Sequence, residues 1–243
     1  MEPIAGYADH EIVARGMRLH WLEWGDVGAP PMVLLHGLTG HAHVWDHMAP
    51  ELARSFHLLV PDQRGHGDSG HTATYSTQDF VDDLEALRVV WGLDRFVLMG
   101  LSMGGHNAMA YAWAYPERVS QLVVIDIPPR LPPVQEWPSW VELEEQARVG
   151  HTAFPTLDAA VEASRSGNPT APEKNLRYRT RWNVDETDAG LVLKWDPKVQ
   201  VAWVPEDLTQ KISEIRTPTL LVRGGRTDTL SESAAVAFFQ CLF

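Results

Sequence analysis

One five-residue stretch, Gly100-Leu101-Ser102-Met103-Gly104, constrains the fold of this chain most strongly. The apolar run 96–99 before it predicts a buried strand, and the run 105–115 after it, rich in Ala and Met, predicts a helix. A chain that turns from strand to helix at a serine needs small neighbours, which Gly100 and Gly104 supply. Such a turn holds the serine hydroxyl clear of the sheet, and the helix N-terminus favours negative charge nearby. We therefore expect Ser102 to be a nucleophile.

Short continuous apolar runs recur along the chain, as expected for strands buried on both faces; they are 32–35, 58–60, 96–99, 122–125 and 219–222. Helical patterns separate the later runs, and one of them is expected to begin at Ser76 or Thr77. The alternating segment 17–24 predicts an antiparallel edge hairpin with 11–14. This order of elements predicts an α/β fold with a doubly wound, mostly parallel sheet.

The pattern of strands and helices breaks after Ile127, where prolines interrupt the chain. Five of the ten tryptophans lie between there and Lys211, namely Trp137, Trp140, Trp182, Trp195 and Trp203. We expect a core domain formed by residues 1–129 and 212–243, and a helical cap formed by residues 130–211. Trp137, Trp140 and Trp182 are expected to line a substrate pocket. The alternative is a helical extension that packs its tryptophans into a small core of its own.

Two further segments supply groups that acyl transfer at Ser102 would need. Gly37 follows the strand 32–35 and allows the backbone to turn, so that the Leu38 amide can point at an oxyanion. The Met103 amide is the expected second donor. Asp228 follows the strand 219–222 and is the expected acid that orients a catalytic imidazole, with Asp126 as the alternative.

Two motifs in the first half resemble binding sites without meeting their requirements. Gly65-x-Gly67-x-x-Gly70 has the spacing of a dinucleotide fingerprint, but no helix begins directly after it. We expect a structural loop instead, braced by Asp62 and Arg64. The segment 41–47 carries three histidines and Asp46, which we interpret as a solvated helix start. No cofactor and no metal are expected.

The composition excludes several classes of partner. A formal net charge of −12 argues against nucleic acid and against anionic membrane surfaces. No apolar run is long enough to cross a bilayer, and the first ten residues lack the features of a signal peptide. The one cysteine, Cys241, has no partner for a disulfide, so a cytoplasmic location is expected.

Taken together, the motifs at His36-Gly37, 62–69, 100–105 and Gly225-x-x-Asp228 resemble those of the α/β-hydrolase superfamily, in its serine-nucleophile, esterase- or lactonase-like branch. The resemblance implies Ser102 as nucleophile, the Leu38 and Met103 amides as oxyanion hole, and Asp228 as acid. It also implies a cap between the strands that end near Ile127 and begin near Thr219.

The chain departs from this pattern at the catalytic histidine. The family places that histidine after one more strand beyond the acid, whereas fifteen residues follow Asp228 and none is histidine. We therefore expect the last strand and helix of the fold to be lacking and the activity to be impaired. His36, His106 and His151 are the substitutes considered, each with nothing in the sequence to support it.

These observations predict a hydrolase that attacks a carboxylic ester or lactone through an acyl-enzyme on Ser102. The expected partner is a small-molecule acyl substrate with an apolar part. The alternatives are a non-catalytic ligand-binding protein with this scaffold, a cofactor-free haloperoxidase or perhydrolase, and a C–C bond hydrolase. The strand 219–222 is expected to be an exposed sheet edge, through which the chain could form a homo-oligomer.

Overall fold

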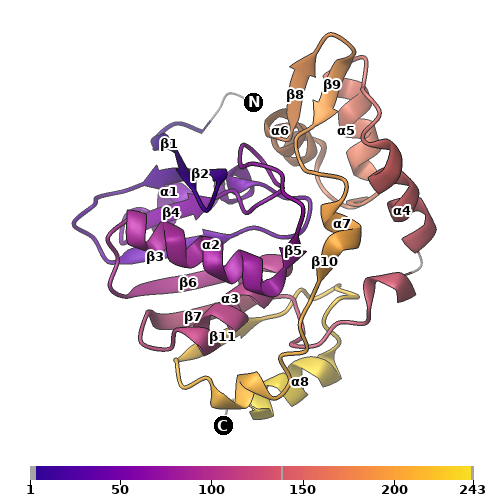
Figure 1. Ribbon diagram of the computed structural model, residues 1–243. Coiled ribbons are helices and arrows are strands. Elements are labelled where there is room, and N and C mark those ends of the chain that lie inside the picture. The colour runs from indigo at the N-terminus through magenta and orange to yellow at the C-terminus, as the bar shows by residue number, and fades with distance from the viewer. Residues whose placement is uncertain (1–3, 138, 242–243) are drawn as a thin grey trace.

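A seven-stranded sheet organises residues 4–137 and 139–241, which are the residues that the computed structural model describes. In spatial order its strands are β1 (Tyr7–Ala14), β2 (Met17–Trp24), β4 (His57–Pro61), β3 (Pro31–Leu35), β6 (Phe96–Leu101), β7 (Val119–Ile125) and β11 (Thr219–Val222). The strands from β4 to β11 are parallel, whereas β1 and β2 form an antiparallel hairpin beside them (Figure 1). The predicted mostly parallel sheet and the predicted hairpin are both confirmed.

The sheet is buried on both faces because successive side chains of its strands enter two different cores. On one face, Val33 and Leu35 of β3 share a core with α2 (Thr77–Val90) and α3 (Met103–Ala114). On the other face, Met32 and Leu34 pack with α1 (Ala49–Leu52) and the preceding 3₁₀ turn (Ala42–Trp45). Burial on both faces explains why the strands read as continuous apolar runs.

The helix boundaries follow local capping. At the start of α2 the Ser76 hydroxyl accepts from the Asp79 amide, and the Asp79 carboxylate accepts from the Ser76 amide. This confirms the predicted start of the helix. The helix α3 begins at Met103, two residues before its expected start, because Gly104 and Gly105 belong to its first turn. After β11 the chain forms the helix α8 (Glu232–Cys241).

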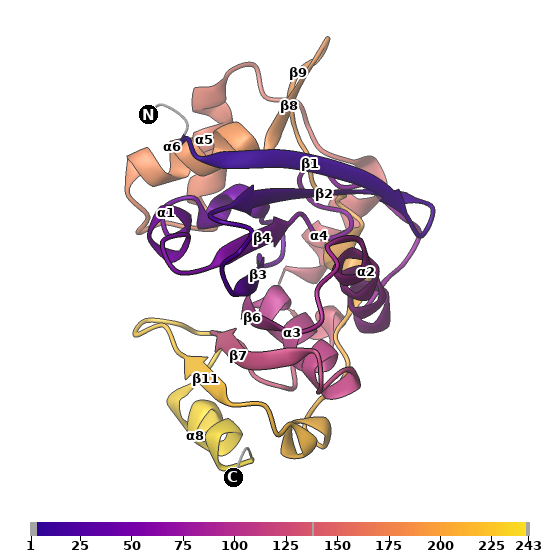
Figure 2. The same cartoon turned by 90° about the vertical axis from the view of Figure 1, so that its left-hand side faces the viewer.

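Residues 130–211, here called the insertion, lie between β7 and β11 and contribute no strand to the main sheet. Their elements are a 3₁₀ turn (Val134–Glu136), α4 (Trp140–Val149), α5 (Leu157–Arg165), α6 (Glu173–Trp182), β8 (Val184–Thr187), β9 (Gly190–Leu193), α7 (Val199–Ala202) and β10 (Trp203–Val204). The insertion ends near a further 3₁₀ turn (Lys211–Glu214). The antiparallel hairpin β8–β9 was not expected from the sequence. Both views place α5, α6 and this hairpin at the end of the molecule opposite α8 (Figure 1, Figure 2).

The insertion is joined to the core by backbone and side-chain contacts with two core loops. β10 pairs in parallel with β5 (Tyr75–Ser76), and the Tyr75 hydroxyl donates to Asp196 at 2.6 Å. The amide of Asp196 donates to the carbonyl of Gly65 at 2.8 Å. The tryptophans Trp195 and Trp203 are buried in one cluster with Tyr75. Two of the insertion's tryptophans therefore pack against core residues rather than in a separate core.

Among the described residues, no helix is both long and apolar enough to span a bilayer.

Candidate active site

Ser102 occupies a strained turn between β6 and α3. Its backbone has φ 50° and ψ −120°, a conformation that a non-glycine residue rarely adopts. The turn is tight enough that a Cβ at Gly104 would lie 2.5 Å from the carbonyl oxygen of Leu35, and one at Gly100 would collide with the Gly104 carbonyl. The Ser102 amide donates to the carbonyl of Ile125 at 2.8 Å, which fixes the turn against β7. The chain thus forms the strand–serine–helix turn that the sequence predicts.

The loop after β3 lies against this turn. A Cβ built on Gly37 would stand 3.3 Å from the Cβ of Ser102, so the backbone that leads to Leu38 passes directly beside the serine. The side chains of Leu38 and Met103 pack in the same apolar cluster. The structure therefore brings together the two residues whose amides were predicted to bind an oxyanion.

A buried polar network holds this loop, and two of its members, Gln63 and Asn107, were not predicted from the sequence. His36 Nδ1 donates to the Gly37 carbonyl at 2.8 Å, and its Nε2 accepts from the Gln63 amide at 2.9 Å. The Gln63 side chain donates to the His36 carbonyl at 2.7 Å and accepts from Asn107 Nδ2 at 2.8 Å. Burial lowers the pKa of His36, so the ring is neutral and acts as a brace.

The two candidate acids differ in their surroundings. Asp126 ends β7 with φ 59°, is partly buried, and accepts from the Gly224 amide at 3.0 Å. Asp228 lies in the exposed loop after β11. Ser102, Asp126 and the Asp228 loop all follow the carboxyl ends of neighbouring parallel strands, where sites of open α/β sheets form.

Each of the eleven histidines contacts a group other than Ser102. Four contact carboxylates: His10 and His57 contact Glu23, His20 contacts Asp62, and His43 contacts Asp46. Five contact backbone carbonyls, which are those of Gly37 (His36), Arg179 (His41), Arg64 (His66), Lys194 (His71) and Trp195 (His151). His47 contacts the Tyr178 ring, and His106 contacts the Thr77 hydroxyl. Within residues 4–137 and 139–241, no side chain hydrogen-bonds to Ser102 Oγ. The substitutes considered for the base, His36, His106 and His151, are therefore held elsewhere.

Comparison with known proteins agrees with this geometry. The model of the α/β hydrolase fold family matches residues 30–237. The chain belongs to the α/β-hydrolase fold family.

Two curated relatives of this α/β hydrolase match most of its length. The 2-(acetamidomethylene)succinate hydrolase of Mesorhizobium japonicum is 30% identical over 210 residues, which cover 84% of this chain and 74% of the relative. The N-formylmaleamate deformylase of Pseudomonas putida is 29% identical over 225 residues, covering 90% and 79% respectively. The crystal structure of E-2-(acetamidomethylene)succinate hydrolase superposes with a TM-score of 0.83 at 25% identity, covering 97% of this chain and 87% of that one. Hydrolase activity is thus the common property of these relatives.

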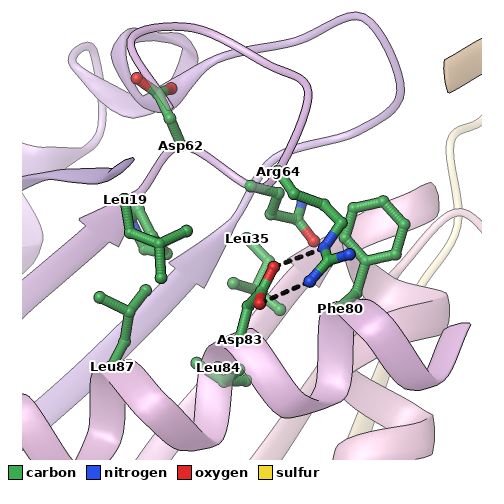
Figure 3. Close-up of a pocket in the computed structure, with 10 residues that line it drawn as sticks. Leu19, Leu35, Asp62, Arg64, Phe80, Asp83, Leu84 and Leu87 are labelled. Carbon is green, nitrogen blue, oxygen red and sulfur yellow. Dashed lines mark hydrogen bonds and ion pairs between the residues drawn. The ribbon is translucent and has the colours of Figure 1, made fainter. Parts of the chain in front are cut away.

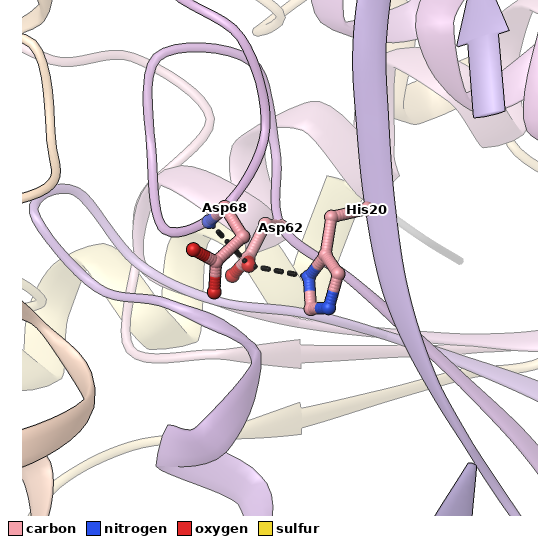
Figure 4. Close-up of side chains that lie close together, drawn as sticks. All are labelled: His20, Asp62 and Asp68. Carbon is pink, nitrogen blue, oxygen red and sulfur yellow. Dashed lines mark hydrogen bonds and ion pairs between the residues drawn. The ribbon is translucent and has the colours of Figure 1, made fainter. Parts of the chain in front are cut away.

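In this α/β hydrolase the loop 62–70 is structural, as predicted. Arg64 makes a buried two-pronged ion pair with Asp83, at 2.6 and 2.7 Å, beside a small cavity lined by Leu19, Leu84 and Leu87 (Figure 3). Asp62 accepts from His20 at 2.7 Å and from the Asp68 amide at 2.9 Å (Figure 4).

His20, Asp62 and Asp68 lie close enough together to resemble a metal site, but protein groups already engage them. The Lys194 ammonium binds both oxygens of Asp68 at 2.7 and 2.8 Å. Burial alone would raise the pKa of Asp62. The hydrogen bond from His20, together with neighbouring positive charge and the hydrogen bond from the Asp68 amide, outweighs burial and holds that pKa below its usual range. The cluster therefore joins β2, the loop 62–70 and the insertion.

The prediction that the histidine segment 41–47 is a solvated helix start is wrong. His41, His43 and Asp46 are buried beneath the insertion. His43 donates to Asp46 at 2.8 Å, and the Tyr178 hydroxyl donates to the same carboxylate at 2.6 Å. The periodicity of the sequence did not reveal this burial, since the covering residues come from α6, more than a hundred positions away.

The three tryptophans predicted to line a pocket lie in different surroundings. Trp137 packs against the apolar cluster that contains Met103. Trp182 stacks on His43, with ring centroids 3.9 Å apart, and so helps to dock the insertion. Trp140 is the first residue of α4 and is partly buried.

Proposed function

We propose that this chain is a serine hydrolase of small-molecule acyl compounds, in which Ser102 forms an acyl-enzyme. The observation that carries the proposal is the strained backbone of Ser102, with the Gly37 loop packed against it. A non-glycine residue persists at such a φ only where the surroundings enforce it, and a nucleophile is a common reason for doing so.

The proposed reaction begins at Ser102. The Ser102 oxygen attacks the carbonyl carbon of the substrate while its proton passes to water, and the negative charge moves onto the carbonyl oxygen. When the carbonyl re-forms, the protonated alcohol or amine leaves and the acyl group stays on Ser102. The amides of Leu38 and Met103 stabilise that oxyanion, each by about 3 kcal/mol in barrier height. Asp228 is the proposed acid for orienting an imidazole, with Asp126 as the alternative. Residues 130–211 act as the cap that covers the substrate, with Trp137, Trp140 and Trp182 as the proposed aromatic lining.

The relatives suggest the kind of bond that is cleaved. The name of one contains an acetamido group on succinate, and the name of the other a formyl group on maleamate. Both are acyl groups attached to nitrogen. We therefore add small N-acyl compounds to the carboxylic esters and lactones expected from the sequence.

One observation favours a second candidate, a non-catalytic ligand-binding protein. All eleven histidines have partners other than Ser102, so this chain holds no imidazole on the serine hydroxyl. A serine without a base is a weak nucleophile, and loss of one triad member leaves only residual catalysis. We expect the 243-residue chain to react slowly.

Labelling with a fluorophosphonate distinguishes the two candidates. Intact-mass spectrometry of the chain should detect one adduct, and peptide mapping should assign it to Ser102. The Ser102→Ala variant should remain unlabelled, whereas a Ser213→Ala control should label like the parent chain. A folded chain without an adduct on Ser102 after prolonged incubation would support the binding protein and exclude the hydrolase.

A further inference from the structure

A cavity of about 380 Å³ lies between the insertion and the loop that follows β3. Thr39 and His41 line it from the core, while α6 contributes Arg179 and Thr180. Its lining contains no aspartate or glutamate, although the chain carries 32 acidic residues and a net charge of −12. Arg179 is the only arginine or lysine among the residues that line it. The cavity is therefore an electropositive place in an acidic protein.

Arg179 differs from the two other arginines of α6 because its side chain contacts neither a carboxylate nor an aromatic ring among the described residues. Arg177 pairs with Asp158 at 2.6 Å, and the Arg181 guanidinium lies over the Trp182 ring. In the described part of the chain, the Arg179 side chain makes no ion pair and no hydrogen bond. Burial lowers the pKa of its guanidinium, with no neighbouring carboxylate to raise it again. A partly buried cation without a partner is costly to the fold, which points to an anion that would pair with it.

Two buried acceptor atoms on residues that line the same cavity also lack partners. His41 Nε2 donates to the Arg179 carbonyl at 3.0 Å, which leaves Nδ1 as an acceptor that no protein group satisfies. Asn183 donates through Nδ2 to the Thr39 carbonyl at 3.3 Å, while its Oδ1 is unsatisfied. Burial lowers the pKa of His41 to about 3, so this ring stays neutral and keeps its free acceptor. Both acceptors are covered by protein atoms, so Arg179 is the unpaired polar group that this cavity leaves for a ligand.

The cavity begins close to Ser102. Thr39 lies two residues after Gly37, so their Cα atoms are at most about 7.6 Å apart. Gly37 itself lies against the Cβ of Ser102. Trp195 lines the cavity and also packs in the cluster that contains Met103 and Leu38. The core side of the cavity therefore belongs to the same loop that passes beside the serine.

We propose that Arg179 and the cavity around it form a carboxylate-binding subsite, which selects acyl substrates that carry a carboxylate away from the bond to be cleaved. This deepens the proposed function, since it names the substrate class of the same site. Arg179 binds this carboxylate through its guanidinium group. Arg179 is thus a specificity-determining residue that takes no part in the chemical step.

Equilibrium binding of succinate tests the subsite without relying on catalysis. The Ser102→Ala chain is titrated calorimetrically with succinate and with succinamide, which has the same skeleton and no charge. Succinate should bind at least about tenfold more tightly, because a charge-assisted pair with an arginine has that order of strength. Arg179→Gln should remove this preference, Arg179→Lys should retain part of it, and the matched control Arg181→Gln should leave succinate affinity within about twofold.

Equal binding of succinate and succinamide by the Ser102→Ala chain would overturn the subsite, and this comparison needs no change at Arg179. Unchanged succinate affinity in a folded Arg179→Gln variant would overturn it as well. Failure of the subsite and failure of the hydrolase are separable. If succinate binding depends on Arg179 but Ser102 does not react with fluorophosphonate, the subsite stands and the hydrolase is excluded. If Ser102 is labelled but succinate is not preferred over succinamide, the hydrolase stands and the subsite is excluded.

Discussion

The backbone of Gly104 touches the backbone of Leu35, since a Cβ at Gly104 would lie 2.5 Å from the Leu35 carbonyl oxygen. This contact joins the first turn of α3 to the end of β3. The serine turn and the loop that leads to Leu38 are therefore positioned by the same close approach, and any side chain there would separate them.

The first prediction concerns this contact. Gly104→Ala must displace backbone atoms, so we expect a loss of about 3 kcal/mol in the free energy of unfolding and of most fluorophosphonate labelling. Urea denaturation measures the first and intact-mass spectrometry the second. Gly225→Ala is the control, because a Cβ there meets nothing within 4 Å and its φ is not positive; it should be neutral or slightly stabilising. Equal stability of the two variants would contradict the close approach.

The second prediction concerns the buried pair of Arg64 and Asp83 (Figure 3). Asp83→Ala leaves the buried Arg64 guanidinium with Asp79, at 3.1 Å, as its remaining charged partner. We therefore expect a loss of about 3 kcal/mol in the free energy of unfolding. Glu145→Ala, which removes the partner of Arg148 in an exposed pair, should leave the free energy of unfolding unchanged within measurement error. Thermal and urea denaturation of both variants provide the measurement. A loss below 1 kcal/mol for Asp83→Ala would show that the pair does little for the fold.

The third prediction concerns acid. Burial lowers the pKa of His41 and of His66 to about 3 and that of His106 to about 4, so these rings are neutral in the fold and become protonated on unfolding below their ordinary pKa of about 6.5. The stability that these neutral rings contribute is therefore complete above pH 6.5 and is lost as the pH falls toward the pKa values that the rings have in the folded protein. At pH 5 each such histidine lowers the free energy of unfolding by about 2 kcal/mol relative to pH 7.

One histidine acts in the opposite direction. Burial would lower the pKa of His20, but the hydrogen bond to Asp62 and the negative charge of that and neighbouring carboxylates together raise it. The contribution of His20 to stability is therefore complete below pH 6.5 and is lost as the pH rises through the folded value. Urea denaturation between pH 7 and pH 5 should still detect a net loss of stability, because the histidines whose pKa burial lowers outnumber the one whose pKa is raised. The loss should be smaller in His66→Gln than in the parent chain. A free energy of unfolding that is constant over this interval would refute the neutral, buried state of these rings.

The fourth prediction concerns the edge of the sheet. Among the described residues β11 is the edge strand next to β7, and the side chains of Leu220 and Val222 are 58% and 38% exposed. An unprotected apolar edge pairs with other chains, so we expect concentration-dependent association in light scattering. Leu220→Lys should shift the population toward the monomer, while Val149→Lys, at an exposed position of α4, should not. A parent chain that stays monomeric at high concentration would exclude association through this edge.

The sequence by itself determined the sheet and the serine turn. Apolar runs that are continuous rather than alternating indicate strands buried on both faces. The two glycines around Ser102 indicate a tight turn from strand to helix, because only residues without side chains fit there. The capping box at Ser76 likewise predicted the start of α2. All of these depend on residues within a few positions of one another, where steric limits and local hydrogen bonds decide the conformation.

Only the tertiary structure decided what surrounds the serine. His41 and His43 were expected in solvent but are buried, because α6 covers them from more than a hundred positions away in the chain. The network of His36, Gln63 and Asn107 is likewise non-local. The unpaired charge of Arg179 is invisible in a sequence, since an arginine without an acidic partner is recognised only when every neighbour in space is known. The burial of a side chain and the pairing of its charge depend on which distant segments come together in the fold. Local sequence patterns therefore do not predict them.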